Sequence, residues 1–184
     1  VRAHSPKPGR GVGSGIGIPG ARIQGSGTRY VGIAPDGEHH RLRSKGFPHL
    51  EGRKASCYDD PERLGLGKFD MVISNDVVEH LYRPLELVRF KKAHLNPGGI
   101  AITATPNFGS YFKNLAYSIF NRWDQVHSPW WDGGHIKFFS KKSLRLLFEN
   151  EGFGNFSWSY VRNINYPMFV MTIVCTCSLN SDSG

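Results

Sequence analysis

The chain has 184 residues, 39% hydrophobic and 12% aromatic, which is enough for one globular domain with a full core and too few for two. No apolar run reaches about 18 residues and the first residues lack the apolar centre of a signal peptide, which argues against a membrane-spanning helix and a secretory leader. Residues 1–68 carry +6 of the net charge of +8 (twelve Lys and Arg against six Asp and Glu), but without a helical stripe or interleaved aromatics, so nucleic acid is not a favoured partner.

The first part of the chain is rich in glycine and has few clear elements. Residues 1–29 are rich in glycine, proline and arginine and are expected to be irregular. Residues 30–33 predict a short strand, residues 36–46 a helix, and residues 53–57 a further strand. This part of the chain therefore supplies strands but little regular pattern between them.

The centre of the chain reads as a strand, a helix and a second strand. Residues 69–74 are a continuous apolar run, which predicts a strand covered on both faces, as in a parallel sheet. Pro84 suits the first turn of a helix, and the Asn-Pro-Gly-Gly of residues 96–99 ends it. Residues 100–105 predict another buried strand. Such a crossover unit is right-handed and binds ligands beyond the carboxyl ends of its strands, which places residues 74–80 at an active-site edge.

Two helices and a long connection follow this central unit. Residues 110–121 predict a helix rich in aromatic side chains, and residues 122–139 a long connection. Ser140 is a good N-cap for the next helix, which Gly152 ends.

The chain closes with a predicted hairpin, whose strands are residues 155–164 and 169–177. Their short connection forces an antiparallel pair. Cys175 and Cys177 lie two apart in the second strand and are predicted to share one packed face. With Cys57 they make an odd number of cysteines without metal-ligand spacing, which favours a reducing compartment, by default the cytoplasm.

Together these elements predict an α/β fold. The sheet is expected to be Rossmann-like, doubly wound and mostly parallel, and to be closed by a C-terminal antiparallel hairpin. The expected organisation is an irregular segment at residues 1–29, a domain at residues 30–178 with an aromatic insertion at 110–139, and a disordered tail at 179–184.

A glycine-rich stretch at residues 11–20, GVGSGIGIPG, fits two cofactor motifs. Gly15, Gly17 and Gly20 match G-x-G-x-x-G, with Asp36 about twenty residues on as a ribose-binding acid, which indicates a dinucleotide. Gly13, Gly15 and Gly17 match G-x-G-x-G, the turn under S-adenosylmethionine in methyltransferases. Both motifs use glycine to bring the backbone close to a nucleotide. In so glycine-rich a segment such spacings also arise by chance.

The downstream motifs decide between the two. They are F-D-x-V-I-S, V-V-E-H-L, L-x-P-G-G before a strand, G-G-H-I-K-F-F-S, and a capped helix ending E-G-F. This series resembles class I S-adenosylmethionine-dependent methyltransferases, and more narrowly the branch of the ubiquinone-biosynthesis O-methyltransferases. The resemblance is specific over residues 69–153, moderate over 154–177 and fragmentary before 69. The closing hairpin is typical of that fold and is not expected of a dinucleotide dehydrogenase domain.

The resemblance implies S-adenosylmethionine as cofactor and carries over its contacts residue by residue. The implied cofactor-binding residues are Gly13, Ser14, Gly15, Gly17, Ala34, Pro35, Asp36, Cys57, Tyr58 and Asn75. The chain departs from the pattern in the first strand, which is weak or missing and lacks its acid. Ala34 also stands where an acid usually binds the ribose hydroxyls, and Asp36 lies two residues on as its substitute.

Three polar residues follow the strand at 69–74. Asp76, Glu79 and His80 lie at i, i+3 and i+4, so one turn of α-helix would bring them to one side. We predict His80 as the general base, Glu79 as the residue that orients it, and His135 as a second catalytic contact to substrate. By resemblance, Asp76, Glu79 and His80 could instead hold a divalent metal, a less favoured role. A third alternative is that Glu79 and His80 only brace the loop.

The aromatic insertion at residues 110–139 is predicted to receive the methyl acceptor. Its rings suit a planar or lipid-like small molecule, and packing of the insertion onto the sheet is the alternative explanation. The helix at 110–121 also suits a peripheral membrane contact. The predicted function is methyl transfer from S-adenosylmethionine to a small-molecule acceptor, with oxygen as the preferred atom. The alternatives are a catalytically impaired remnant or interaction domain, and an NAD-dependent oxidoreductase.

Overall fold

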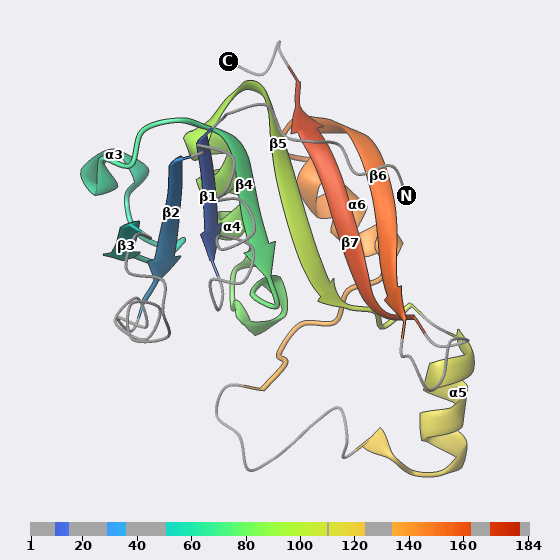
Figure 1. Cartoon of the computed structure of the whole chain (residues 1–184). Helices are drawn as coiled ribbons and strands as arrows, with labels where there is room; N and C mark the ends of the chain where they lie inside the picture. The colour runs from blue at the N-terminus through green and yellow to red at the C-terminus, as the bar shows by residue number, and fades with distance from the viewer. Residues whose placement is uncertain are drawn as a thin grey trace.

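The computed structural model describes residues 10–14, 29–35, 51–109, 111–123, 134–162 and 170–180. Within these residues a seven-stranded sheet has the order β3-β2-β1-β4-β5-β7-β6 (Figure 1). Strands β1 to β5 are parallel, and β7 runs antiparallel to both of its neighbours. This arrangement confirms the predicted α/β class, with a mostly parallel sheet and an antiparallel C-terminal hairpin.

The elements of the described residues have the following bounds. The strands are β1 (Arg10–Ser14), β2 (Arg29–Ala34), β3 (Glu51–Lys54), β4 (Phe69–Asn75), β5 (Leu95–Pro106), β6 (Phe153–Arg162) and β7 (Val170–Leu179). The helices are α3 (Pro61–Leu64), the 3-10 turn η2 (Val78–His80), α4 (Pro84–His94), α5 (Tyr111–Ile119) and α6 (Lys141–Glu149). None of these helices is long and apolar enough to cross a bilayer.

The first strand, expected to be weak or missing, is present at the centre of the sheet. Its sequence, RGVGS, has little strand propensity of its own. It forms because it is paired on both sides, with Val12 opposite Val31 of β2 and Val72 of β4. Backbone ladders on two sides compensate for the missing side chains. The folded sheet therefore begins within the segment of residues 1–29 that was expected to be irregular.

Several other boundaries differ from those expected. The strand predicted at residues 53–57 is Glu51–Lys54, because the chain turns directly after pairing with β2. Strand β5 starts at Leu95 rather than Ile100, because the residues that end α4 continue in extended form past an irregularity in the register with β4. The predicted tail begins too early, since Leu179 belongs to β7. The helix predicted at 36–46 lies outside the described residues.

Helices α4 and α6 lie side by side against one face of the sheet (Figure 1). Helix α4 begins at Pro84, as predicted. Helix α6 begins with the predicted N-cap, where Ser140 Oγ accepts from Ser143 N at 3.2 Å and Ser143 Oγ accepts from Ser140 N at 2.9 Å. Its Leu144 and Phe148 are buried against the sheet. The core therefore lies between these two helices and strands β4, β5 and β7.

An unexpected lysine lies inside this core. Lys91 of α4 is fully buried, and its ammonium donates to Ile102 O at 2.6 Å and to Thr103 Oγ1 at 2.7 Å. Cys175 and Cys177 are both buried on the adjoining face of β7, as predicted. Burial lowers the pKa of Lys91 to about 7, against a smaller opposing effect of the two thiols.

Replacing Lys91 with methionine tests this buried amine. The unfolded chain holds the lysine proton up to its ordinary pKa of 10.5, whereas the folded chain releases it above about 7. The unfolded state binds more protons between these values, so the free energy of unfolding of the wild-type protein rises with pH across that window, by up to about 1.4 kcal/mol per pH unit. We expect Lys91→Met to lack this rise in urea denaturation curves.

The exposed Lys142 of α6 supplies the matched control, because Lys142→Met should keep the wild-type pH dependence. If Lys91→Met kept the wild-type slope between about pH 7 and pH 10, the buried amine would not be the titrating group.

Candidate functional site

Strands β1 to β5 all end at one edge of the sheet, the lower edge in Figure 1. At that edge Ser14 of β1 lies between Ile33 of β2 and Ser74 of β4, and Asn75 ends β4 beside Ala104 of β5. From β1 the strand order runs outward in both directions, to β2 and β3 on one side and to β4 and β5 on the other. Ligands of open parallel sheets bind at such a switch point.

Most of the residues predicted to bind the cofactor lie along this edge. They are Gly13 and Ser14 at the end of β1, Ala34 and Pro35 at the end of β2, Cys57 and Tyr58 after β3, and Asn75 at the end of β4. The remaining three, Gly15, Gly17 and Asp36, lie outside the described residues. Four strands therefore bring together positions that are far apart in the sequence.

Several hydrogen bonds hold the turn after β3. Ala55 N donates to Ala34 O at 3.2 Å, which ties the turn to the end of β2. Ser56 N donates to Asp59 Oδ2 at 2.7 Å, and Tyr58 N donates to Ser56 Oγ at 3.3 Å. These bonds give the turn a fixed shape beside the carboxyl ends of β2 and β3.

Cys57 and Tyr58 are the uncharged side chains of this turn, directly before the exposed Asp59. Burial raises the pKa of the half-buried Cys57 thiol, so the thiol stays uncharged near neutral pH. The Tyr58 hydroxyl accepts from Arg83 N at 3.3 Å, and the Arg83 guanidinium lies 5.5 Å from the centre of the Tyr58 ring. An uncharged thiol beside an aromatic ring fits a flat, neutral base such as adenine. The residues present are therefore compatible with the adenosyl part of the cofactor.

The chain does not form the predicted α-helical turn after β4. Asp76 has a left-handed backbone, with φ 50°, and its N–H donates to Ala104 O at 3.1 Å. The Asp76 carboxylate accepts from the Asn75 side-chain amide at 2.7 Å. A 3-10 turn then follows at Val78–His80. The expected grouping of Asp76 with Glu79 and His80 assumed α-helical spacing, and the left-handed residue removes that spacing.

His135 joins Glu79 and His80 in the place predicted for Asp76. Possible ligand atoms of these three side chains all lie within 4.8 Å of one another. His80 Nε2 is 4.0 Å from Glu79 Oε1, and the two imidazole ring centres are 4.9 Å apart. Glu79 is fully buried, while both histidines are partly exposed. The structure therefore brings together the three residues that were predicted to be catalytic.

Backbone contacts hold this cluster in place. The carbonyl of Glu79 accepts from Ile136 N and Lys137 N, both at 3.0 Å, and fastens the returning segment to η2. His80 Nδ1 lies 3.1 Å from Gly134 O. Because a carbonyl oxygen can only accept, Nδ1 carries the hydrogen and the Nε2 of neutral His80 is left as a proton acceptor.

The carboxyl group of Glu79 is held by a single side-chain hydrogen bond. Its Oε2 accepts from Thr105 Oγ1 at 2.9 Å, and its buried Oε1 accepts none from the side chains that the structure describes. Burial raises the pKa of Glu79, and the charge of Asp76 adds to this, against the opposing effects of its own backbone amide, Thr105 and His80. Glu79 therefore supplies a buried carboxyl oxygen beside the two imidazoles.

A row of rings leads from the cluster to the surface. The ring of Phe108 lies 6.2 Å from that of His135 and 4.6 Å from that of Phe138. Phe138 is 45% exposed. The sequence analysis missed Phe108, although its position two residues after β5 was an available signal. It also missed Thr105, which only the pairing of β5 with β4 places under Glu79.

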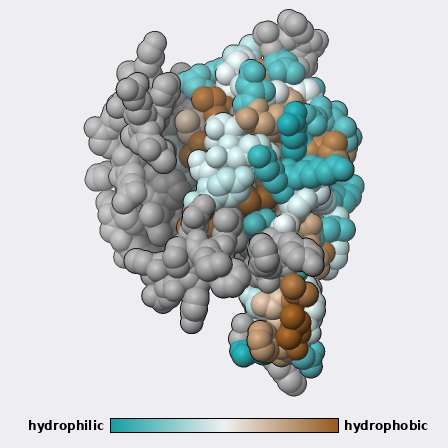
Figure 2. All heavy atoms as spheres, turned by 90° about the vertical axis from the view of Figure 1, so that its right-hand side faces the viewer, coloured by the Kyte–Doolittle hydropathy of each residue, from teal (hydrophilic) through white to brown (hydrophobic). Residues whose placement is uncertain are grey.

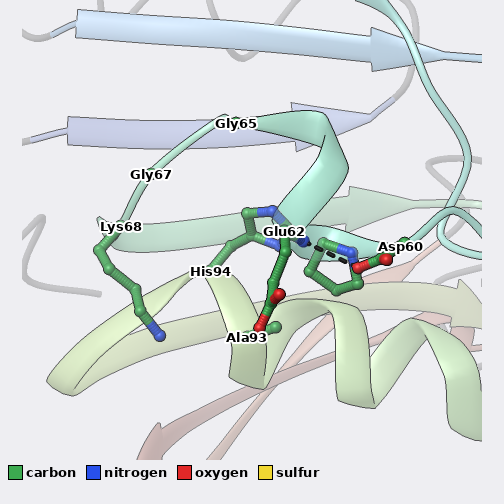
Figure 3. A pocket seen from close by; sticks show the side chains of 8 residues that line it. Asp60, Glu62, Gly65, Gly67, Lys68, Ala93 and His94 are labelled. Atoms are coloured by element: carbon green, nitrogen blue, oxygen red, sulfur yellow. Dashed lines mark hydrogen bonds between the residues drawn. The ribbon is translucent and has the colours of Figure 1, made fainter.

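A hollow of about 700 Å³ lies at the opposite edge of the sheet (Figure 3). Its lining comes from α3, from the residues before β4 and from the end of α4: Asp60, Pro61, Glu62, Gly65, Gly67, Lys68, Ala93 and His94. Because Lys68 and His94 directly precede β4 and β5, this hollow is on the amino-terminal side of the sheet. It is separate from the cluster of Glu79, His80 and His135.

A family model described as a methyltransferase domain matches residues 11–157. The chain belongs to this methyltransferase domain family. Membership confirms the class of S-adenosylmethionine-dependent methyltransferases that the sequence resembles, and favours the methyltransferase interpretation of the glycine stretch over the dinucleotide one. The narrower resemblance to the ubiquinone-pathway branch stays a prediction. A search of curated proteins finds no match.

Solved structures share the fold at low sequence identity. A Burkholderia thailandensis 1,6-didemethyltoxoflavin-N1-methyltransferase, with bound 1,6-didemethyltoxoflavin and S-adenosylhomocysteine, has a TM-score of 0.66 at 14% identity, over 95% of this chain and 72% of that one. A Haloferax volcanii chain from a complex of a methyltransferase with its Trm112 activator has a TM-score of 0.74 at 14% identity, over 97% and 85%. The CurJ carbon methyltransferase has a TM-score of 0.69 at 14% identity, over 98% of this chain and 50% of that one.

Replacing Glu79 with glutamine tests the buried carboxyl. Because burial raises its pKa above the ordinary 4.5, the folded chain keeps this proton at pH values where the unfolded chain has released it. The free energy of unfolding of the wild-type protein should therefore fall as the pH rises from about 4.5 through the raised pKa. Glu79→Gln has no such proton and should gain stability relative to wild type across that range.

Urea denaturation at about pH 5 and about pH 8 measures this difference. The exposed Glu62 of α3 is the control, and Glu62→Gln should follow the wild-type curve. Parallel pH curves for Glu79→Gln and wild type would contradict the raised pKa.

Proposed function

We propose that this methyltransferase transfers a methyl group from S-adenosylmethionine to a hydroxyl oxygen of a small apolar or aromatic molecule. The observation that carries the proposal is the cluster of Glu79, His80 and His135 beside the carboxyl ends of β4 and β5. In this proposal the cluster supplies a proton acceptor near the carboxyl edge, where open parallel sheets bind their ligands.

The cofactor supplies an already activated methyl group, so the chain needs no covalent nucleophile. Its task is to align the acceptor and exclude water, a contribution of about 7 to 11 kcal/mol in well-oriented reactions. We assign the adenosyl contacts to Cys57, Tyr58 and Asn75, and the turn below the cofactor to the residues that follow Ser14. The three free thiols support a reducing compartment for the protein.

His80 is the proposed base. Its Nδ1 hydrogen is directed to Gly134 O, and we assign to Nε2 the proton of the acceptor's hydroxyl group. The oxygen would bond to the methyl carbon as the sulfur–methyl bond breaks, with S-adenosylhomocysteine as the leaving group. Glu79 Oε1 lies 4.0 Å from the same Nε2, and we assign Glu79 the role of stabilising the charge that the imidazole gains. The structurally similar proteins include a nitrogen and a carbon methyltransferase, so the proposal that oxygen is the methylated atom depends on the chemistry of the cluster alone. The rings of Phe108 and Phe138 support an apolar or aromatic acceptor.

A non-catalytic relative is the second candidate, and Ala34 favours it. This alanine ends β2 where an acid would bind the ribose hydroxyls. Loss of that contact would weaken the binding of the cofactor, because a good hydrogen bond to a charged group contributes about 1.5 to 3 kcal/mol. Asp36, two residues on, is our proposed replacement.

Calorimetric titration with S-adenosylhomocysteine separates these two candidates. We expect binding, and we expect Asn75→Ala to weaken it by roughly threefold to tenfold through loss of one hydrogen bond. Asn96, at the opposite edge, bonds Asp70 and provides the control, so Asn96→Ala should bind like wild type. If the wild-type protein gave no heat of binding at millimolar ligand, the result would support the non-catalytic candidate.

Turnover assays test the base. With an acceptor found by screening hydroxylated aromatic and lipid-like molecules, His80→Ala should lower kcat by about 100-fold or more, and Asn96→Ala should leave it unchanged. Unchanged turnover in His80→Ala would contradict the role of His80 as base. Addition of EDTA should have no effect. Inactivation by EDTA and recovery with Mn²⁺ or Zn²⁺ would instead show that Glu79, His80 and His135 hold a metal.

A further inference from the structure

Helix α5 projects from the carboxyl edge of the sheet with an exposed apolar face (Figure 1). Leu115 is 41% exposed, Ile119 66% and Phe120 71%. Leu115 and Ile119 are four residues apart and share one side of the helix. Figure 2 shows the apolar surface of this projecting part, below a body whose facing surface is largely polar. Such a face needs a partner, because water is an unfavourable neighbour for it.

The segment around this face has a net positive charge. Residues 107–123 and 134–148 contain Lys113, Arg122, Lys137, Lys141, Lys142 and Arg145, and the residues between them add Asp124 and Asp132, so the whole segment carries a net charge of +4. The pairing of Asn107 with Phe139 brings these two segments together at the base of α5. Arg122, Lys137 and Lys142 are exposed. An apolar strip in a segment of net positive charge complements an anionic surface.

The same helix is attached to the row of rings that ends at the cluster. The side chain of Asn114 in α5 donates to Phe108 O at 2.8 Å. Phe108 contacts Phe138 at the surface and His135 inside. An apolar molecule that entered beside α5 would therefore meet aromatic surface from Phe138 as far as His135.

We propose that α5 docks this protein on a membrane surface containing anionic phospholipid, from which the methyl acceptor enters along Phe138 and Phe108. This inference rests on the proposed function of the same site. Apolar side chains inserted at the lipid boundary, beside lysine and arginine and near aromatic rings such as Tyr117 and Trp123, are the chemistry of interfacial helices.

The size of the face favours lipid over a protein partner. A nine-residue helix is only about 14 Å long, and one strip along it is far smaller than the roughly 800 Å² per partner of a stable protein interface. A membrane sets no such minimum, because insertion of a few side chains and several weak charge contacts add together.

Vesicle co-sedimentation of the whole chain tests the proposal. We expect binding to phosphatidylcholine vesicles with about 30% phosphatidylglycerol, and little binding to phosphatidylcholine alone or at high salt. The double variant Ile119→Glu with Phe120→Glu should bind at least about tenfold more weakly. Leu146→Glu is the matched control, since Leu146 of α6 is 48% exposed but lies away from α5, and it should bind like wild type. All variants should keep the wild-type affinity for S-adenosylhomocysteine.

Three results would overturn the inference. They are no binding of the wild-type chain to the anionic vesicles, equal binding of the double variant, and a lipid-free dimer in sedimentation velocity that the double variant abolishes. The last result would identify a second copy of the chain as the partner of α5. Vesicle binding without S-adenosylhomocysteine binding would overturn the proposed function alone, and the reverse would overturn only the membrane contact.

Discussion

The backbone carbonyl of Glu79 accepts two amide hydrogens, from Ile136 and Lys137, and this contact joins the two halves of the candidate site. Glu79 belongs to the turn after β4, whereas the amides come from a segment more than fifty residues later. Together with the contact between His80 Nδ1 and Gly134 O, this backbone contact fixes the position of His135 relative to His80. Because the Glu79 side chain is buried against Thr105 of β5, the sheet itself sets the position of the cluster.

The chemistry at this edge follows from burial and from the direction of a few hydrogen bonds. Gly134 O decides which nitrogen of His80 carries the hydrogen, and the buried carboxyl of Glu79 faces the other nitrogen. These are two backbone or core features, and neither requires an exposed charge. A methyltransferase needs little more from its own side chains, because its methyl donor is already activated and alignment contributes most of the rate.

The fold could be predicted from the sequence where burial leaves a pattern. The apolar run of β4, the proline that starts α4 and the serine cap of α6 each marked an element, and the hairpin followed from its short connection. Strand β1 could not be predicted, because its stability comes from neighbours on both sides rather than from RGVGS. The burial of Lys91 was also missed, since no sequence pattern shows that the core contains two hydrogen-bond acceptors for its side chain.

The candidate site could be predicted in part. Glu79, His80 and His135 were identified from motifs, and the structure brings them together. The tentative grouping of Asp76 with Glu79 and His80 does not form, because Asp76 does not continue a helix. A residue with φ 50° gives no clear signal in a single sequence. Phe138 lies within the predicted aromatic insertion, but its contact with Phe108 could not be predicted, because that contact depends on how the chain returns to the sheet.

The segment that carries α5 leaves and rejoins the sheet between two paired residues. Asn107 pairs with Phe139, and Phe108 N donates to Phe139 O at 3.0 Å, so the chain leaves and rejoins the sheet at one point. Residues 110–133 lie outside both the contacts at this base and the segment that Glu79 holds, so we expect changes in their length or composition to leave the register of β5, the cap of α6 and the cluster unaltered. The fold thus separates a module that, in our proposal, selects what is methylated and where from the sheet to which we assign the methyl donor. Exchanging this one segment between relatives is therefore a practical route to new acceptors.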